Sequence, residues 1–329
     1  MSIYKYFILI ILILAIFTAG VFMVFRNKKS HTGINNILPE KNSKSEILKS
    51  DIVIPDKKDI KILFLGDMML DRYIREVAMK KENDFILEKA GSLLKDNDLV
   101  VGNLEGPITD KNSISIGTTV GEKDHFSFTF HSSWAKTLAD NNIKLVNLGN
   151  NHILNFEEDG LNQTEKYLTE SGVGYFGAPE KTNLRYKIEE LNGMKIGFVG
   201  YNQFESGSVE KTLADIEAVK KHSDLVILYT HWGKEYETTI LPSIRMLGQK
   251  FIDAGADLII GSHPHVVEIS EEYKGKKIYY SLGNFIFDQY FSPETTKGLA
   301  VQIIVSPDKN FSFQEYDIAL RNNGQTEIK

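Results

Sequence analysis

Side chains able to bind metal ions or transfer protons occur in short polar motifs along this chain of 329 residues. The motifs are Gly66-Asp67, Asn103-Leu104-Glu105, Asn150-Asn151-His152, His231 and His263-Pro264-His265. Each follows an apolar run that predicts a buried strand, so each is expected where a strand ends and a loop begins. Carboxylate, amide and imidazole groups from separate strand ends can together form a metal centre on a rigid α/β scaffold.

Single residues of this set also fit ordinary structural roles. Asp67, Asn103 and Glu105 stand at positions where such side chains commonly form turns or cap helices. His152 alone fits a solvated loop, but two amides and an imidazole crowded at 150–152 would be costly to bury without partners. The functional interpretation therefore depends on the whole set.

His263-Pro264-His265 gives the sharpest local prediction. Alternate residues of an extended segment face the same side, and Pro264 favours extended backbone at the residue before it. The two imidazoles are therefore predicted to face one point. The histidines outside the motifs are expected at the surface: His31, His125, His131 and His222.

This set of side chains favours hard-to-borderline divalent ions such as Mn, Fe or Zn. Two ions about 3.5–4 Å apart can bridge a hydroxide and hold a phosphate oxygen for in-line attack. His152 is then placed to protonate the leaving group. The residues therefore predict a centre with one or two divalent ions and a proton donor.

Short β-branched runs and intervening helical stretches indicate the elements that position the motifs. Strands are predicted at 61–66, 98–103, 143–150, 195–201, 224–231 and 256–263. Helices are predicted at about 131–142, 158–171, 210–222 and 240–255, the last capped by Gly255. The segment from Lys276 is rich in strand formers and resembles antiparallel sheet. The pattern predicts one α/β domain of two packed sheets flanked by helices.

Charge and composition limit the class of partner. Four of the 38 Lys and Arg lie in the first 29 residues, so the other 300 carry 34 against 44 Asp and Glu. This acidic balance argues against nucleic acid as the main partner. The absence of cysteine excludes disulfides, a thiolate nucleophile and Cys-ligated zinc. The chain also has no G-x-x-x-x-G-K-[ST] or G-x-S-x-G motif.

The N-terminus predicts a membrane anchor. Residues 7–25 are 19 uncharged, mostly apolar residues, nearly enough to cross a hydrocarbon core of about 30 Å. A cleaved signal peptide is the alternative, but its apolar run is shorter and ends in small residues, whereas this run ends in Phe22-Met23-Val24-Phe25. Flanking cations alone favour a cytoplasmic domain by one charge. The predicted organisation is a flank at 1–6, an anchor at 7–25, a polar linker at 26–58 and a folded domain at 59–329.

Six ordered motifs between about Ile60 and Asp288 carry a resemblance to a known family: GDMMLDR, VGNLEGPIT, GNNHILNF, THWGKEYE, GSHPHVVE and YSLGNFIFD. They resemble the bacterial capsule-synthesis CapA family, also called poly-γ-glutamate synthesis proteins, within the calcineurin-like metallophosphoesterase superfamily. The resemblance implies a four-layer αββα sandwich with an N-terminal transmembrane helix, facing the outside of the cell membrane. It implies action in the synthesis, export or attachment of an anionic surface polymer. The implied partners are the membrane, the polymer or its precursor, and other synthase subunits.

The resemblance also implies roles for individual residues. Asp67 corresponds to the first metal ligand, Asn151 to the amide ligand and His152 to the general acid. The imidazole ligands correspond to His231, His263 and His265. Asn150 and Asn284 are expected directly behind the ligands.

The chain departs from the superfamily's enzymes at two positions and from the capsule family at a third. Met69 stands where they have His, and Asn103 stands where they have a bridging Asp, although Glu105 could reach in instead. Asn155 stands where the capsule family often has Asp. A neutral amide at the bridge lowers the affinity for a second cation, so a one-ion or altered centre is an alternative to a two-ion centre.

Three functions are compatible with these observations. The first is a surface-polymer protein with a metal-dependent hydrolase or transferase centre. The second is a non-catalytic scaffold of a membrane synthase complex with a degenerate site. The third, a soluble phosphatase or nucleotidase released to the medium, requires a cleaved anchor.

Overall fold

The computed structural model describes residues 58–179 and 184–329. The predicted anchor at 7–25 and all but the last residue of the predicted linker at 26–58 lie outside the described residues. Within the described ranges, no helix has both the length and the apolar character that a membrane span requires.

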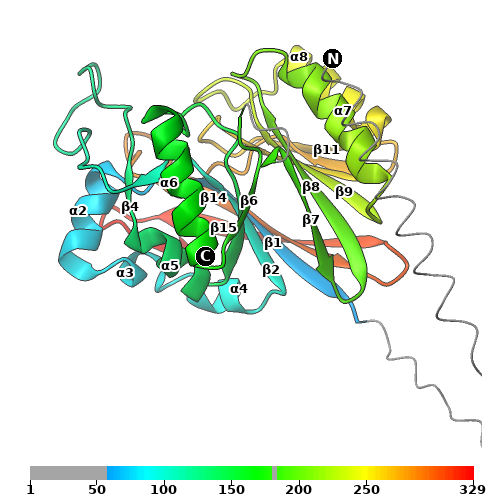
Figure 1. The fold of residues 1–329 in the computed structure, drawn as a ribbon, viewed down its shortest axis with the longest axis horizontal. Coiled ribbons are helices and arrows are strands. Elements are labelled where there is room, and N and C mark those ends of the chain that lie inside the picture. The colour runs from blue at the N-terminus through cyan, green and yellow to red at the C-terminus, as the bar shows by residue number, and fades with distance from the viewer. Residues whose placement is uncertain (1–57, 180–183) are drawn as a thin grey trace, which may run out of the picture. The chain divides into compact units, whose positions relative to one another are not determined.

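Two mixed β-sheets form the centre of the described chain (Figure 1). The first sheet has the order β16 (Thr326–Ile328), β15 (Phe311–Leu320), β14 (Lys297–Val305), β1 (Ile60–Met68), β2 (Leu99–Leu104), β5 (Ile143–Asn147) and β6 (Gly174–Phe176), with β13 (Asn284–Ile286) also paired to β1. The second sheet has the order β11 (Ser270–Tyr273), β12 (Lys276–Tyr279), β10 (Leu258–Ser262), β9 (Leu225–His231), β8 (Met194–Asn202) and β7 (Tyr186–Leu191). A small separate pair is formed by β3 (Ile108–Thr109) and β4 (Phe130–His131).

Helices cover the outer faces of both sheets. The first sheet packs on α2 (Arg72–Lys81), α3 (Asp84–Leu87), α4 (Gly91–Lys95), α5 (Ser133–Asp140) and α6 (Glu157–Glu170). The second sheet packs on α7 (Ser208–Lys220) and α8 (Pro242–Ala254), which lie side by side in Figure 1. The resulting order of layers is helix, sheet, sheet, helix.

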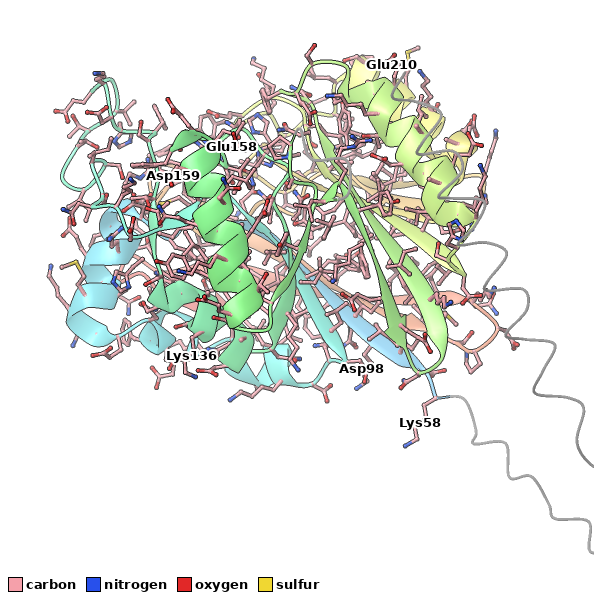
Figure 2. All side chains as sticks on the ribbon, viewed as in Figure 1. Lys58, Asp98, Lys136, Glu158, Asp159 and Glu210 are labelled. Atoms are coloured by element: carbon pink, nitrogen blue, oxygen red, sulfur yellow. The ribbon has the colours of Figure 1, made fainter. Side chains whose placement is uncertain are left out.

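Three apolar cores hold these layers together. Strand β1 borders two of these cores, which explains why its residues 62–65 are all apolar. Ile62 and Phe64 enter the core between the two sheets, whereas Leu63 and Leu65 enter the core beneath the helices. Successive side chains of a strand point to opposite faces, so a strand buried on both faces must be apolar throughout. Figure 2 shows side chains filling the space between the layers, with charged residues such as Lys136 and Glu210 at the periphery.

Parallel pairing in the first sheet brings polar residues into line at its carboxyl edge. Asp67 on β1 is in register with Asn103 on β2 and with Asn284 on β13. Asn103 is in turn in register with Asn147 on β5. The strand register therefore places four polar side chains beside one another.

The second sheet also aligns polar residues at the carboxyl ends of its strands. His231 at the end of β9 is in register with Asn202 on β8 and Ser262 on β10. The hydroxyl of Tyr229 donates a hydrogen bond to the carbonyl of Leu65, which ties the two sheets together just below these strand ends. The polar edges of the two sheets thus meet.

The predicted α/β domain of two packed sheets with outer helices is confirmed. The six predicted strands correspond to β1, β2, β5, β8, β9 and β10, and the four predicted helices to α5, α6, α7 and α8. Gly255 caps α8 with a φ of 122°, as predicted. The tail is only partly antiparallel: β14, β15 and β16 are, but β12 is parallel to β10 and β13 is parallel to β1.

Candidate metal centre

Asp67 is fully buried at the meeting point of the two sheets. Its Oδ1 accepts a hydrogen bond of 2.8 Å from the side-chain amide of Asn103, and its Oδ2 accepts one of 3.0 Å from the backbone N–H of His263. Nδ1 of His265 lies 3.3 Å from Oδ2. Burial acts to raise the pKa of Asp67, but His265, His231 and the backbone donor outweigh burial and hold the pKa below its ordinary value. Asp67 is therefore an anion at neutral pH.

Glu105 supplies a second buried carboxyl group. Its Oε1 lies 3.5 Å from Nε2 of His265 and 4.0 Å from Nε2 of His152. Both of its oxygens are buried without a hydrogen-bond partner among the described residues. Burial, and after it the charge of Asp67, raises the pKa of Glu105 well above its ordinary value. Buried carboxyl oxygens without donors are costly, and a bound cation would supply the partner that they lack.

Two imidazoles and an amide form a second convergent group. Nε2 of His231 lies 2.8 Å from Oδ1 of Asn151 and 3.2 Å from Nδ1 of His263. Burial is the main cause that lowers the pKa of both histidines, to about 3 for His263. Both rings are therefore neutral at pH 7, and neutral imidazole is the form that binds metal.

The predicted extended backbone at His263-Pro264-His265 is wrong, although the two imidazoles do lie near each other. The φ angles are 99° at His263 and 59° at His265, both in the left-handed region. The ring centroids are 6.0 Å apart. Non-glycine residues rarely adopt such angles, and strained backbone of this kind clusters at functional sites. A tight turn rather than an extended segment thus brings the rings together.

His152 lies at the edge of the cluster, where its ring packs 4.5 Å from the ring of Phe128. Its Nδ1 lies 3.2 Å from Oδ1 of Asn155, and its Nε2 lies 3.2 Å from the amide nitrogen of Asn151. Burial lowers the pKa of His152 to about 4. Asn155 thus keeps an oxygen acceptor on Nδ1, which leaves Nε2 as the nitrogen that faces the cluster.

Amide side chains lie around this cluster and contact its carboxylate and imidazole groups. Nδ2 of Asn103 faces Asp67, and its Oδ1 accepts hydrogen bonds of 3.0 Å from Asn147 and 3.2 Å from Asn150. Oδ1 of Asn284 lies 3.0 Å from Nδ1 of His265. Asn103 therefore presents its amide nitrogen to Asp67 and its oxygen to two neighbouring amides. Asn150 contacts Asn103 and the carbonyl of Leu104, and Asn284 contacts His265.

The structure brings all of the predicted site residues into one connected cluster, while their roles stay predictions. Two groups of side chains have potential ligand atoms within 4.8 Å of one another: Asp67, Glu105 and His231, and Glu235, His263 and His265. Glu235 was missed because nothing about an exposed carboxylate distinguishes it from a solvated surface charge. Its place in the motif THWGKEYE, four residues after His231, is the signal that could have identified it.

A buried ion pair beside the cluster was also missed. Arg72 is buried with a φ of 48°, and its guanidinium pairs with Asp288 through two nitrogens. The guanidinium lies 5.0 Å from the ring centroid of Phe128 and 5.6 Å from that of Phe287, and these rings pack on His152 and His265. The pair therefore fixes the walls on either side of the centre.

His125 corrects the prediction that every histidine outside the motifs is a surface residue. It is only 8% exposed, and its Nε2 lies 2.9 Å from the guanidinium of Arg72. Burial, and after it the charge of Arg72, lowers the pKa of His125. His131 and His222 are exposed as predicted, and His31 lies outside the described residues.

Replacing Asp288 with asparagine is expected to lower the free energy of unfolding by about 3–5 kcal/mol, because it leaves the buried Arg72 guanidinium without its counter-ion. Urea denaturation of the variant and the parent chain measures this difference. Asp253→Asn is the matched control: it removes an exposed pair with Lys274 and is expected to cost less than about 1 kcal/mol. Equal losses in the two variants would contradict a structural role for the Arg72–Asp288 pair.

Buried carboxylates and imidazoles at the strand ends of two packed sheets define an α/β protein with a candidate divalent-metal centre. Residues 61–289 match the family described as bacterial capsule synthesis protein PGA_cap, and the chain belongs to this family. The predicted family is thereby confirmed.

Two relatives that match well are capsule-related proteins of Bacillus. The chain is 32% identical over 245 residues to the PGA biosynthesis protein CapA of Bacillus subtilis, covering 69% of this chain and 63% of the relative. It is 29% identical over 271 residues to the capsule biosynthesis protein CapA of Bacillus anthracis, covering 74% of this chain and 64% of the relative. The matches thus span just under two thirds of the length of each relative.

Similarity to solved structures is weaker. A 5'-nucleotidase from Candida albicans aligns with a TM-score of 0.44 and 14% identity, covering 81% of this chain and 52% of that chain. TT1561 of Thermus thermophilus aligns with a TM-score of 0.41 and 9% identity, covering 78% of this chain and 98% of that chain. Scores at this level support no conclusion about function.

Proposed function

We propose that this chain is a membrane-anchored protein of the synthesis, export or attachment of poly-γ-glutamate or a similar anionic surface polymer. Its domain lies outside the cell and carries a metal-dependent centre of the phosphoesterase type, acting as a hydrolase or transferase. The observation that supports this most is the pair of unpartnered, buried oxygens of Glu105 among neutral imidazoles, in a member of a capsule-synthesis family.

The residues fit one or two divalent ions such as Mn, Fe or Zn. Asp67, Glu105 and His265 offer two carboxylates and an imidazole, while Asn151, His231 and His263 offer an amide oxygen and two imidazoles. Such an ion, when bound, activates water and polarises a phosphoryl or carbonyl oxygen. Nε2 of His152 lies at the edge of this group, where it can exchange a proton with a leaving group.

A non-catalytic scaffold of a synthase complex is the alternative, and two observations favour it. Met69 is buried and its sulfur accepts a hydrogen bond from the backbone N–H of Asp71, so it contributes no ligand in place of the expected His. The amide of Asn103 donates to Asp67 at the place of a bridging carboxylate. Both features are expected to lower the affinity for a second ion more than the affinity for a first ion.

The decisive measurement is the metal content of the full-length chain. We expect at least one equivalent of Mn, Fe or Zn per chain by elemental analysis, its loss on chelation, and return of phosphodiester hydrolysis on reconstitution. A chain that stays metal-free after reconstitution with all three metals would overturn the catalytic proposal. A metal-free, inactive chain that still supports polymer assembly in cells would establish the scaffold.

The membrane proposal has its own test. Intact-mass analysis of the mature protein is expected to find residues 1–25 still present, and protease added to whole cells is expected to remove the domain. A mature chain that lacks those residues would instead support a released enzyme.

A further inference from the structure

A pocket of about 680 Å³ opens beside the candidate metal centre. Its lining comes from the start of α2, the loop between β3 and β4, the segment after β9 and the segment after β13. None of the roles proposed above uses the pocket. Its size is that of a small-molecule site, which commonly combines an apolar lining with a few fixed polar groups.

The rim of the pocket is unusually apolar for an exposed surface. Val120, Phe126, Tyr236 and Phe291 are 78%, 46%, 43% and 65% exposed, and all four line this one pocket. The rings of Tyr236 and Phe291 contact each other edge to face, with centroids 5.2 Å apart. Apolar side chains gathered around a concavity indicate a binding site rather than scattered surface exposure.

The positive and negative charges that line the pocket do not cancel. The guanidinium of Arg72 is neutralised by Asp288, since the two form a buried, two-point ion pair. His125 is neutral at pH 7 because burial and Arg72 lower its pKa. Glu235 remains as an exposed carboxylate, and no salt bridge joins it to a Lys or Arg of the described chain. The pocket therefore carries a net negative charge beside aromatic faces.

The pocket adjoins the candidate metal centre through Glu235 and Tyr236. A carboxylate oxygen of Glu235 lies within 4.8 Å of ring nitrogens of His263 and His265. The ring of Tyr236 lies 6.1 Å from that of His265, and its backbone N–H donates a hydrogen bond of 2.8 Å to the carbonyl of Pro264. A molecule with one group at the centre could therefore place its next few atoms in the pocket.

We propose that this pocket binds a primary ammonium group on an apolar stem, with Glu235 as the counter-ion and Tyr236, Phe126 and Phe291 as the aromatic faces. Carboxylates attract cations, and aromatic faces bind ammonium groups within about 6 Å of the ring centroid. The inference rests on the proposed function, because it describes the part of the substrate that extends from the metal centre. The amine belongs to the side chain of an amine-bearing acceptor, because the amino terminus of a γ-glutamyl polymer carries a carboxylate on the carbon that bears the amine.

The binding test uses three small probes of four carbon atoms each: n-butylammonium, butyrate and 1-butanol. Ligand-observed NMR titrations of the full-length chain are run in the chelated and the metal-loaded forms. In the chelated form, we expect butylammonium to bind roughly ten-fold more tightly than butyrate, equivalent to about 1.4 kcal/mol. Butyrate binding as tightly as the amine, or no saturable binding of the amine, would overturn the proposal.

Two variants separate the charge from the aromatic surface. Glu235→Gln is expected to remove the preference for the amine, whereas the control Glu272→Gln, an exposed residue of β11, leaves it intact. Phe291→Ala is expected to weaken both the amine and 1-butanol several-fold, whereas Phe313→Ala on β15 changes neither. A preference that survives in Glu235→Gln would show that Glu235 is not the counter-ion.

Two longer probes distinguish the sources of the amine. A γ-glutamyl tetramer with a free amino terminus, compared with its N-acetylated form, tests the polymer end, and Nα-acetyl-lysine amide tests an acceptor side chain. Binding of Nα-acetyl-lysine amide in preference to the tetramer supports the proposal, whereas binding of neither, or of the tetramer in preference, overturns it. Wild-type protein that stays metal-free after reconstitution but keeps the amine preference would reject the proposed function alone. Protein that takes up metal but shows no amine preference in the chelated form would reject this inference alone.

Discussion

Replacing His231 with alanine is expected to lower the affinity of the chain for divalent metal by more than about 100-fold, beyond the 10–100-fold typical of changes behind the ligands. The physical reason is the position of its ring, which is fully buried with Nε2 next to Oδ1 of Asn151 and Nδ1 of His263. Alanine removes the candidate ligand nitrogen from the buried group of Asp67, Glu105 and His231. Elemental analysis after dialysis, and competition with a chromogenic chelator, measure the loss.

Two further variants serve as controls for this prediction. His222→Ala removes an exposed imidazole just after α7 and is expected to leave metal content unchanged. His231→Gln retains most of the buried volume, so loss of metal from a chain with unaltered thermal unfolding separates ligation from folding. Full metal retention in folded His231→Ala protein would exclude His231 as a ligand.

Replacing Gly66 with alanine is expected to destabilise the domain by about 3 kcal/mol or more, at the severe end of overpacking effects. A Cβ atom at this position would lie 1.9 Å from the carbonyl oxygen of Gly283, and that oxygen accepts the backbone N–H of Asp67 at 3.0 Å. The two backbones cannot separate without breaking this hydrogen bond. Urea denaturation measures the stability, and metal content is expected to fall with it because Asp67 moves.

Gly91→Ala is the matched control for this substitution. Gly91 begins α4, and a Cβ atom there would meet nothing within 4 Å. Its replacement is expected to be neutral or to stabilise the domain by up to about 1 kcal/mol, because alanine reduces the freedom of the unfolded chain. Similar losses in both variants would show that close packing at Gly66 is not the cause.

Much of the fold was predictable because its central strands are encoded locally. The runs around Phe64, Val101, Leu228 and Ile260 are apolar on both faces, and only strands covered on both sides have that requirement. The polar residue at the end of each run marks the carboxyl end of the strand. Candidate ligands could thus be identified from single segments, since each follows its own strand.

Other features of the centre depend on contacts between residues far apart in the sequence, which no local sequence pattern predicts. The left-handed backbone at His263 and His265 follows from packing, and opposes the extended preference of a residue before proline. The Arg72–Asp288 pair joins residues 216 positions apart, and His125 is buried because it lies against that pair. Glu235 became a candidate only when folding placed it beside the two imidazoles. Long-range pairing, rather than local propensity, therefore fixes these parts of the centre.

The pairing of β1 determines when the centre can form. This strand is the first of the domain to be synthesised, yet its neighbours on one side are β14 and β13, the former ending at Val305. Asp67 consequently lacks its final surroundings until nearly the whole chain has emerged. Contacts between such distant segments close slowly. The surroundings of Asp67 are thus completed late in folding, when β13 and β14 join β1.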